Sequence, residues 1–206
     1  MIALGAACAG LSVVFVVWFW FSPEHTDVGY APEQPISYSH KLHAGLMGMD
    51  CRYCHRMVEE GPNATVPDAA TCMGCHKQVK LDSIKLQLLR DDFGDGAATN
   101  PAIPWIKVHM LPEYAYFNHA IHVKAGVGCT SCHGRVDQME IVRQVEPMSM
   151  GWCLECHRDP APHLRPDGVK ATQMDWKPSD ESLAKAHARL ESGELNPPTH
   201  CSACHR

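Results

Sequence analysis

Several kinds of chemistry have no residues to support them in this sequence of 206 amino acids. Basic residues do not outnumber acidic ones: 18 Lys and Arg stand against 23 Asp and Glu, and the net charge of −5 gives no attraction to a nucleic-acid backbone. Aromatic residues make up only 7% of the chain and charged residues 20%. No glycine-rich phosphate loop, nucleophile elbow or pair of catalytic carboxylates stands out. The sequence therefore argues against a nucleic-acid partner and offers no hydrolytic or nucleotide-binding site.

Charge is absent from the beginning of the chain, where Glu24 is the first charged residue. About 20 apolar residues, each rising about 1.5 Å in a helix, cross a hydrocarbon core of roughly 30 Å. The run ends in the aromatic cluster 18–21, which is typical of a membrane–water interface, and Pro23 follows. A cleaved signal peptide would need small residues where these bulky aromatics stand. We therefore expect residues 1–22 to be a retained transmembrane anchor.

Cysteine and histidine are the residues that the sequence has in excess, with 11 and 14 copies. The cysteines are too sparse, and the chain too long, for a small disulfide scaffold. Ten of them fall in five C-x-x-C-H motifs, numbered here 1 to 5 in chain order. The motifs are Cys51–His55, Cys72–His76, Cys129–His133, Cys153–His157 and Cys201–His205, with Cys54, Cys75, Cys132, Cys156 and Cys204 as second cysteines.

The C-x-x-C-H pattern is the attachment motif for c-type haem. Its two thiols add to the two vinyl groups of the porphyrin, and the adjacent histidine binds the iron from one face. Zinc ribbons and thioredoxin-like redox pairs also use C-x-x-C, but neither requires the following histidine. We predict five covalently bound haem c groups, with His55, His76, His133, His157 and His205 as proximal iron ligands.

A repeat underlies the motifs. Tyr38-Ser-His40-Lys-Leu-His43 precedes motif 1, and Phe117-Asn-His119-Ala-Ile-His122 precedes motif 3. The histidine pairs are offset by 79 residues and the cysteines that follow them by 78. Residues i and i+3 of a helix lie on the same side, one turn apart, so that each pair can serve two neighbouring irons. We expect His40, His43, His119 and His122 to be distal ligands.

The fifth distal ligand is open. We favour His109, in a segment 106–111 that has a strand-like pattern. One alternative is His187, on what should be the apolar face of a helix over Ser179–Ser192. Another is Met150 before motif 4, since a thioether also ligates haem iron.

The predicted fold class is mostly loop with short α-helices, because about 37 residues per haem leave only a thin core. We divide the chain into a transmembrane anchor, an extended linker, two dihaem modules with a connector between them, and a C-terminal part. These segments are 1–22 (anchor), 23–37 (linker), 38–90 (module 1), 91–114 (connector), 115–165 (module 2) and 166–206 (C-terminal helix and fifth haem).

The aromatic-x-His-x-x-His unit followed by C-x-x-C-H resembles the class III multihaem cytochromes c. The runs Phe117–Val123, Gly128–Gly134 and Met150–Arg158 look like the pentahaem subunit of alternative complex III, a bacterial quinol-oxidising membrane complex. The resemblance extends over nearly the whole chain. The repeat plan and the Met-Gly-Trp-Cys-Leu-Glu-Cys-His-Arg run carry its specificity, since the haem motifs alone are generic.

The resemblance implies a single-pass protein of the bacterial cytoplasmic membrane with its haem domain on the periplasmic side. Electrons would come from an iron–sulfur subunit, supplied by quinol-oxidising subunits within the membrane. They would leave to a monohaem cytochrome c or another soluble acceptor. The chain itself would be an electron-transfer subunit and no enzyme on its own.

Two other functions are weighed against this one. A one-anchor multihaem quinol dehydrogenase would oxidise quinol directly, and motif 1 followed by Met57 superficially fits that group. The histidine pair before motif 1 and the long stretch 23–50 after the anchor argue against it. A multihaem reductase needs an iron with an open face, and nine histidines outside the motifs for five distal places argue against that.

Overall fold

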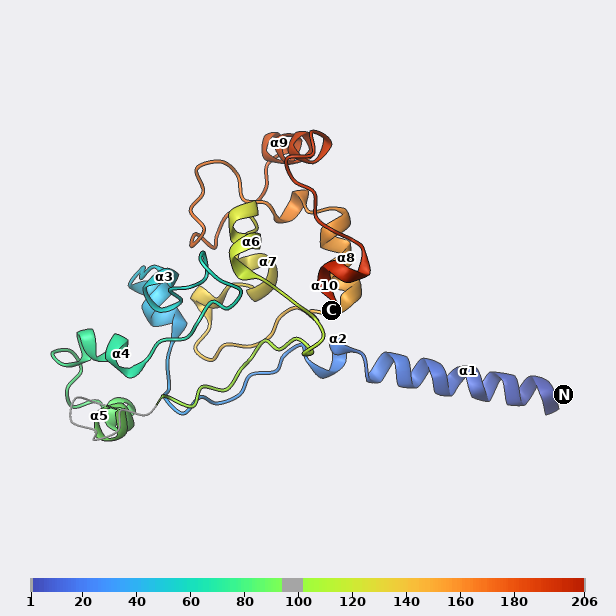
Figure 1. Cartoon of the computed structure of the whole chain (residues 1–206). Helices are drawn as coiled ribbons and strands as arrows, with labels where there is room; N and C mark the ends of the chain where they lie inside the picture. Colours follow the sequence, from blue (N-terminus) through green and yellow to red (C-terminus); the bar gives the residue numbers. More distant parts are fainter. Residues whose placement is uncertain (1, 94–101, 206) are drawn as a thin grey trace.

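Short helices joined by long irregular segments make up the computed structural model, which describes residues 2–93 and 102–205 (Figure 1). Within these ranges there is no β-strand, only the isolated bridges Ala115–His205 and Val127–Leu164. The predicted fold class is thus confirmed. The α-helices are α1 (Ile2–Trp20), α2 (Pro23–Thr26), α3 (Cys51–Cys54), α4 (Ala69–His76), α5 (Gln87–Phe93), α6 (His119–Ala125), α7 (Thr130–His133), α8 (Met150–Arg158), α9 (Asp180–Glu191) and α10 (Cys201–Cys204). The other helical turns are η1 (Lys41–Leu46, a π-helix) and the 3-10 turns η2 (Ile84–Leu86), η3 (Val136–Gln138) and η4 (Ala161–His163).

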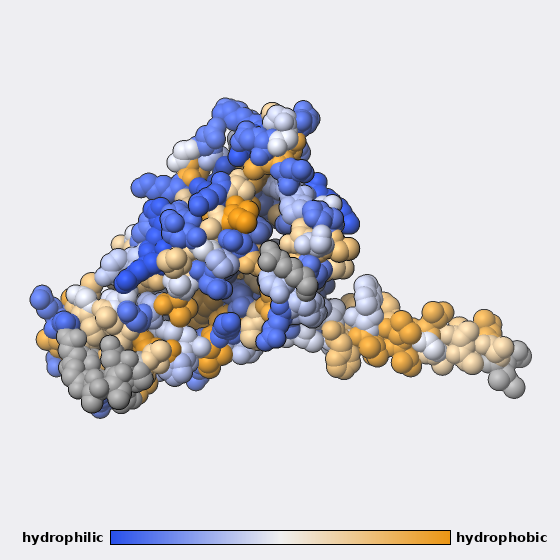
Figure 2. Space-filling model, in the orientation of Figure 1, coloured by the Kyte–Doolittle hydropathy of each residue, from blue (hydrophilic) through white to orange (hydrophobic). Residues whose placement is uncertain are grey.

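Helix α1 extends away from the rest of the molecule, and its surface is almost uniformly apolar (Figures 1 and 2). Its window Ala3–Trp20 has a mean hydropathy of 2.0, and no part of that window is buried. Among the described residues it is the one helix long and apolar enough to cross a membrane. A helix that is apolar all round needs a partner other than water, so α1 is a candidate membrane anchor.

The linker after α1 is fastened to the body of the protein, whereas the sequence suggested only an extended spacer. Gly29 donates a backbone hydrogen bond to Gln144 (2.8 Å), and Gln144 donates one to Tyr30 (3.0 Å). Further along, the Gln34 side chain pairs with the backbone N–H and carbonyl of Ile106 (2.9 and 2.8 Å). The linker therefore runs along the body from the anchor to module 1.

The described residues form two small hydrophobic clusters. One contains Ile36, Ala69, Met73, Leu89, Phe93 and Ile103, and the other is built on Ala161, Leu164 and Ala186. Leu89 is the only large side chain in the described ranges that is fully buried. The middle of the molecule has no comparable apolar cluster in the described parts, and cysteine and histidine side chains lie there instead.

Helix α9 matches the helix predicted over Ser179–Ser192. Ser179 forms a reciprocal capping box with Ser182, and Ser192 is the C-cap. Its Ala186 is buried and packs with Leu183 and Leu190. The placement of His187 on this apolar face was wrong. His187 follows the buried Ala186 and is rotated from it by about 100° around the helix axis, and its side chain is exposed.

The connector also departs from expectation. Residues 106–111, which contain His109, form irregular backbone with a bend and no strand. Pro104 and Pro112 bracket this short segment, and a proline cannot donate to a strand ladder. The glycine-rich part of the connector, 94–101, lies outside the described residues.

Candidate haem sites

Every C-x-x-C-H motif lies on a helical turn, which puts its two cysteines on one face. The local sequence favours these turns through capping. Asp50, Asp68 and Ser149 accept hydrogen bonds from backbone N–H groups at the beginnings of α3, α4 and α8 (2.8, 2.8 and 3.3 Å). None of the ten motif cysteines is part of a disulfide.

Each of motifs 1 to 4 has its histidine facing a histidine of the repeat. The ring centres are 6.5 Å apart in His40–His55, 6.3 Å in His43–His76, 6.4 Å in His119–His133 and 6.1 Å in His122–His157. Two imidazoles that bind one metal ion from opposite sides, with bonds of about 2.0 Å, have ring centres about 6.3 Å apart. The four spacings therefore fit an iron between each pair.

Backbone carbonyls fix which nitrogen of these imidazoles carries the proton. In seven of the histidines, Nδ1 lies 2.6–3.1 Å from a carbonyl oxygen, and because a carbonyl can only accept, Nδ1 must be the donor. This leaves Nε2 unprotonated and available to a metal. The seven histidines and their acceptors are His43 (Ser39), His55 (Thr65), His76 (Val79), His119 (Pro62), His122 (Asn118), His157 (Pro198) and His205 (Tyr114).

The aromatic residue of each repeat holds both of its histidines. Tyr38 stacks on His43, with ring centres 4.4 Å apart, and meets His40 edge-on at 4.8 Å. Phe117 makes the same contacts, at 4.4 Å with His122 and 4.8 Å with His119. The sequence alone shows the aromatic position of each repeat but indicates neither its contacts with the histidines nor the carbonyl acceptors. Only the recurrence of an aromatic two residues before each pair could have indicated the first.

No protein-family model matches this chain. One curated protein is similar to it over 125 residues with 33% identity. That protein is the multihaem cytochrome c subunit of a menaquinone reductase from Nitratidesulfovibrio vulgaris strain Hildenborough. The chain thus resembles a multihaem cytochrome c. The similar region is 60% of this chain and 56% of the relative, so the chain spans little more than half of the relative's length.

The multihaem cytochrome c resemblance supports the coarser part of the sequence prediction. The relative's name specifies neither alternative complex III nor a number of haems. It does describe a cytochrome subunit of a quinone-linked complex. The finer assignments, to alternative complex III and to five haems, are taken up below as proposals.

Burial favours the uncharged form of two of the predicted ligand histidines and two of the motif cysteines. Burial, with the neighbouring imidazoles, lowers the pKa of His40 to about 4 and that of His133 to about 3. Burial raises the pKa of the Cys51 and Cys132 thiols to about 11 and about 12. Neutral imidazoles have the free lone pair that iron ligation requires.

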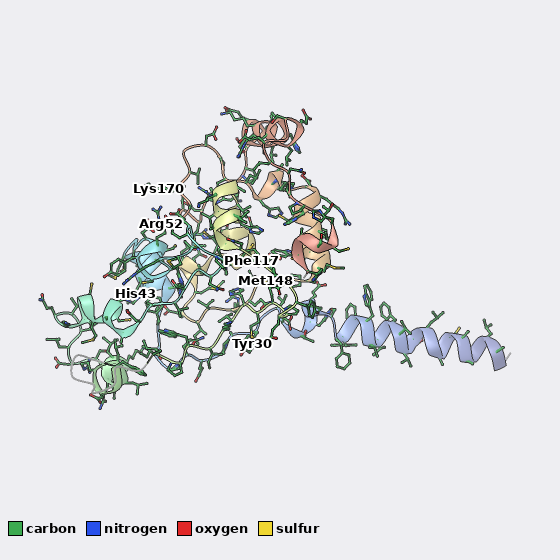
Figure 3. All side chains as sticks on the ribbon, viewed as in Figure 1. Tyr30, His43, Arg52, Phe117, Met148 and Lys170 are labelled. Atoms are coloured by element: carbon green, nitrogen blue, oxygen red, sulfur yellow. The ribbon has the colours of Figure 1, made fainter. Side chains whose placement is uncertain are left out.

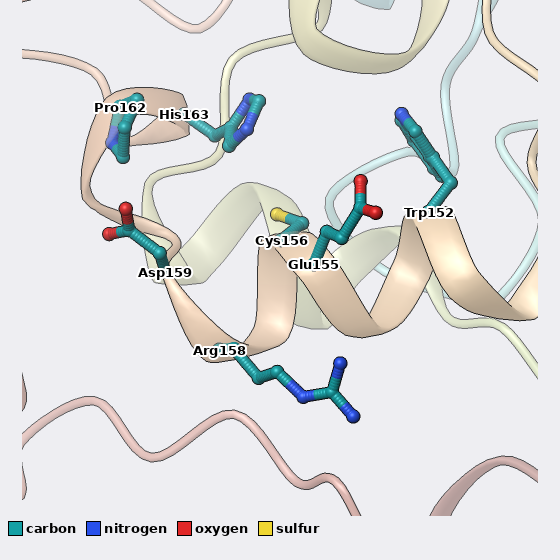
Figure 4. Close-up of a pocket in the computed structure, with 7 residues that line it drawn as sticks. All are labelled: Trp152, Glu155, Cys156, Arg158, Asp159, Pro162 and His163. Carbon is teal, nitrogen blue, oxygen red and sulfur yellow. The ribbon is translucent and has the colours of Figure 1, made fainter.

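A cavity beside motif 4 provides room for a prosthetic group. It has a volume of about 440 Å³ and is lined by Trp152, Glu155, Cys156, Arg158, Asp159, Pro162 and His163. In Figure 4, the side chains of Trp152, Glu155 and Cys156 on α8 face Pro162 and His163 of η4. The volume is in the range of small-molecule and cofactor sites, and a motif thiol opens into it. Cys153 and the facing pair His122–His157 do not line this cavity, so the fit of a haem at motif 4 rests on that pair, with ring centres 6.1 Å apart.

Motif 5 is the exception to the pairing. The His205 ring contacts Tyr114, and within 2–93 and 102–205 no histidine ring faces it at the spacing of the other four motifs. His109 lies against motif 3 instead, edge-on to His133 with ring centres 4.4 Å apart, and its buried Nε2 has no hydrogen-bond partner. His187 is exposed, and the Met150 side chain is 65% exposed. His109 is thus placed at motif 3 rather than at motif 5, and the distal ligand of motif 5 stays open.

Proposed function

We propose that this chain is a membrane-anchored pentahaem cytochrome c. It carries electrons from a quinol-oxidising membrane and iron–sulfur assembly to a periplasmic cytochrome c or a similar acceptor. The observation that carries the proposal is the set of four facing histidine pairs, 6.1–6.5 Å apart, each of which joins a motif histidine to a repeat histidine. Five C-x-x-C-H motifs with free thiols support five haems.

The residues have distinct duties in this proposal. The ten motif cysteines attach the haems, and the five motif histidines are proximal ligands. His40, His43, His119 and His122 are distal ligands at motifs 1 to 4. Haem supplies one-electron chemistry when it is bound. At motifs 1 to 4 a histidine on each side would hold the iron, and the carbonyls and aromatic rings that position these histidines would keep them from moving when the charge changes.

Closed axial positions favour conduction over catalysis. A substrate can react at an iron only where a coordination place is open. At motifs 1 to 4 both places face an imidazole. At these four sites the chain would therefore pass electrons rather than bind a substrate, and quinol would be oxidised in its membrane-embedded partners.

The partner set rests on α1 and on the curated relative. An exposed apolar helix of 19 residues would hold the chain at the membrane, with the haem domain on the periplasmic side, where c-type haem is attached. The relative belongs to a menaquinone reductase, which supports membrane-embedded quinone-linked partners. The resemblance to alternative complex III adds the iron–sulfur subunit and the monohaem cytochrome c acceptor.

A second candidate function uses the same haems and partners but transfers electrons in the opposite direction. The relative's name describes a reductase of menaquinone, which favours electrons moving towards the membrane quinone. Direct quinol oxidation at motif 1 is less well supported, because the whole linker separates α1 from His40.

The experiment is purification of the native membrane complex. We expect membrane-embedded subunits and an iron–sulfur subunit to co-migrate with the chain, and a pyridine-haemochrome yield near five haems per chain. In liposomes, the complete complex should reduce these haems with quinol, and this subunit alone should not. Rapid, inhibitor-sensitive reduction by the subunit alone would overturn the conduit proposal. Reduction of quinone by a reduced periplasmic carrier, without the reverse reaction, would establish the second direction.

A further inference from the structure

The two modules contact each other at motifs 1 and 3. Each module contributes a segment that packs next to the first motif of the other. The beginning of α6, in module 2, donates backbone hydrogen bonds from His119 and Ala120 to Pro62 and Gly61, in the loop after motif 1 (3.2 Å each). Nδ1 of His119 donates to the same Pro62 carbonyl (2.8 Å). The distal histidine of motif 3 is thus positioned by the loop of motif 1.

The converse contact completes the exchange. The η1 turn, which follows His40, packs against η3, just after motif 3. Lys41 donates a backbone hydrogen bond to Met139 (3.0 Å), and Gly45 lies so close to the Asp137 carbonyl that a side chain there would collide with it. Module 2 therefore packs beside motif 1 of module 1, and module 1 packs beside motif 3 of module 2.

Charge at this junction is complementary. A cavity of about 460 Å³ between the modules is lined by Asp50, Arg52, Glu59 and Glu60 from module 1 and by Val123, Lys124, Arg165, Lys170 and Ala171 from the other side. Three of the four charged residues of module 1 are acidic, and all three on the other side are basic. Arg52 and Lys170 are labelled in Figure 3.

The second motif of each module lies on the outer side of this junction. His40 and His43 are on one turn and face His55 and His76, and Arg56 donates to Thr71 (2.8 Å), so motif 2 adjoins motif 1. In module 2, His119 and His122 on one turn of α6 face His133 and His157, so motif 4 adjoins motif 3. Motif 5 adjoins motif 4, because Nδ1 of His157 donates to the carbonyl of Pro198, just before motif 5 (2.6 Å).

We propose that the five haem sites lie in single file in the order 2–1–3–4–5, so that motif 1 is an inner site and motif 2 an end. This inference rests on the proposed function and adds the path that electrons take. The motif helices follow the same order across Figure 1: α4, α3, α7, and then α8 with α10. The order of the motifs along the sequence would instead give 1–2–3–4–5.

One end of the row of haem sites lies nearer the anchor helix α1 than the other. The Gly29–Gln144 and Gln144–Tyr30 hydrogen bonds fasten the end of the anchor region just ahead of α8. Figure 1 shows α8 and α10 on the side from which α1 extends, and α4 on the far side. Site 5 therefore exchanges electrons nearer the membrane, and site 2 exchanges them with a partner further from it.

Neighbour counting by electron paramagnetic resonance tests the order on the full-length, haem-loaded protein. His40→Ala opens site 1 and His43→Ala opens site 2, and each should convert one low-spin ferric haem to high-spin. The changed spin alters the signals of adjacent haems. We expect the opened site 1 to change two other low-spin signals and the opened site 2 to change one.

If opening site 1 changed one low-spin signal and opening site 2 changed two, the proposed order would be overturned. Equal numbers of changed signals in the two variants would also overturn it. His40→Met and His43→Met repeat the test while keeping a ligand, since a methionine raises the potential of one site and shifts the titrations of its neighbours. His25→Ala, at an exposed histidine of α2 that is not among the candidate ligands, is the matched control and should change no signal. Fewer than five haems per chain, or a wild-type protein in which sites 1 to 4 are not low-spin, would contradict the proposed function rather than the order.

Discussion

The angles between the facing imidazole planes predict which ferric haem gives which resonance signal. The planes are nearly parallel at site 1 (9°) and site 3 (11°), turned by 41° at site 4 and by 71° at site 2. Each imidazole raises the one iron d orbital that overlaps its π system. Two parallel rings raise the energy of the same d orbital and so separate it from the other d orbital of π symmetry. Two perpendicular rings raise the energies of both orbitals equally.

The size of the effect follows from the geometry. For two equal ligands the splitting falls as the cosine of the angle between their planes. Relative to parallel rings, it stays at about 0.98 or more at sites 1 and 3, falls to about 0.75 at site 4 and falls to about one third at site 2. The oxidised protein should therefore show two rhombic signals, one intermediate signal and one strongly anisotropic signal from these four sites.

Substitution assigns the signals. His43→Ala should delete the strongly anisotropic signal, and His119→Ala should delete a rhombic one; each should also create one high-spin haem that binds carbon monoxide when reduced. Tyr38→Ala keeps His43 but removes the ring stacked on it at 4.4 Å, so the site 2 signal should broaden without becoming high-spin. Loss of a rhombic signal in His43→Ala, or four rhombic signals in the wild type, would refute the reasoning.

Three further predictions concern the scaffold. Ser179→Ala removes the α9 cap and should lower the free energy of unfolding by about 1 kcal/mol in urea titrations, with unchanged haem spectra. Gly45→Ala should sharply reduce the yield of haem-loaded protein, because the new methyl group meets the Asp137 backbone, whereas Gly151→Ala in α8 has room and should be tolerated; equal yields would contradict the junction. Salt and carbonate washes should leave the protein in the membrane, and a variant without residues 1–22, exported by a cleavable signal, should be soluble and haem-loaded; native protein that washes off would point to a cleaved signal.

Local patterns in the sequence were sufficient for the helices and for the pairing of ligands within each module. Ser179 predicted the beginning of α9, and the His-x-x-His spacing predicted that one turn would face two motifs. Both depend on residues three or four apart, whose relative positions a helix fixes. The apolar helix α1 could also be predicted from the sequence, because its length and its hydropathy are enough to identify it.

Long-range contacts decided what the sequence left open. Nothing near His109 indicates that its ring lies against His133, since that placement depends on how the connector crosses module 2. The same holds for the Pro62 carbonyl, which lies 57 residues before the His119 that it orients. Partners this far apart leave no periodic trace, so only the folded chain reveals them.

The proposed single file bears directly on the choice between conduit and quinol dehydrogenase. Direct oxidation of quinol at motif 1 requires quinol to reach an iron that has neighbouring sites on both sides and facing imidazoles on both axial positions. The linker between α1 and His40 pairs with Gln144 and with Ile106, so it cannot fold away to bring motif 1 to the bilayer without breaking these hydrogen bonds. The site nearest the anchor is motif 5, where no facing histidine ring is found among the described residues. Any chemistry at the membrane surface would therefore have to begin at the C-terminal haem, and removing that haem by Cys201→Ala with Cys204→Ala should stop electron exchange with the membrane partners while sites 1 to 4 stay low-spin.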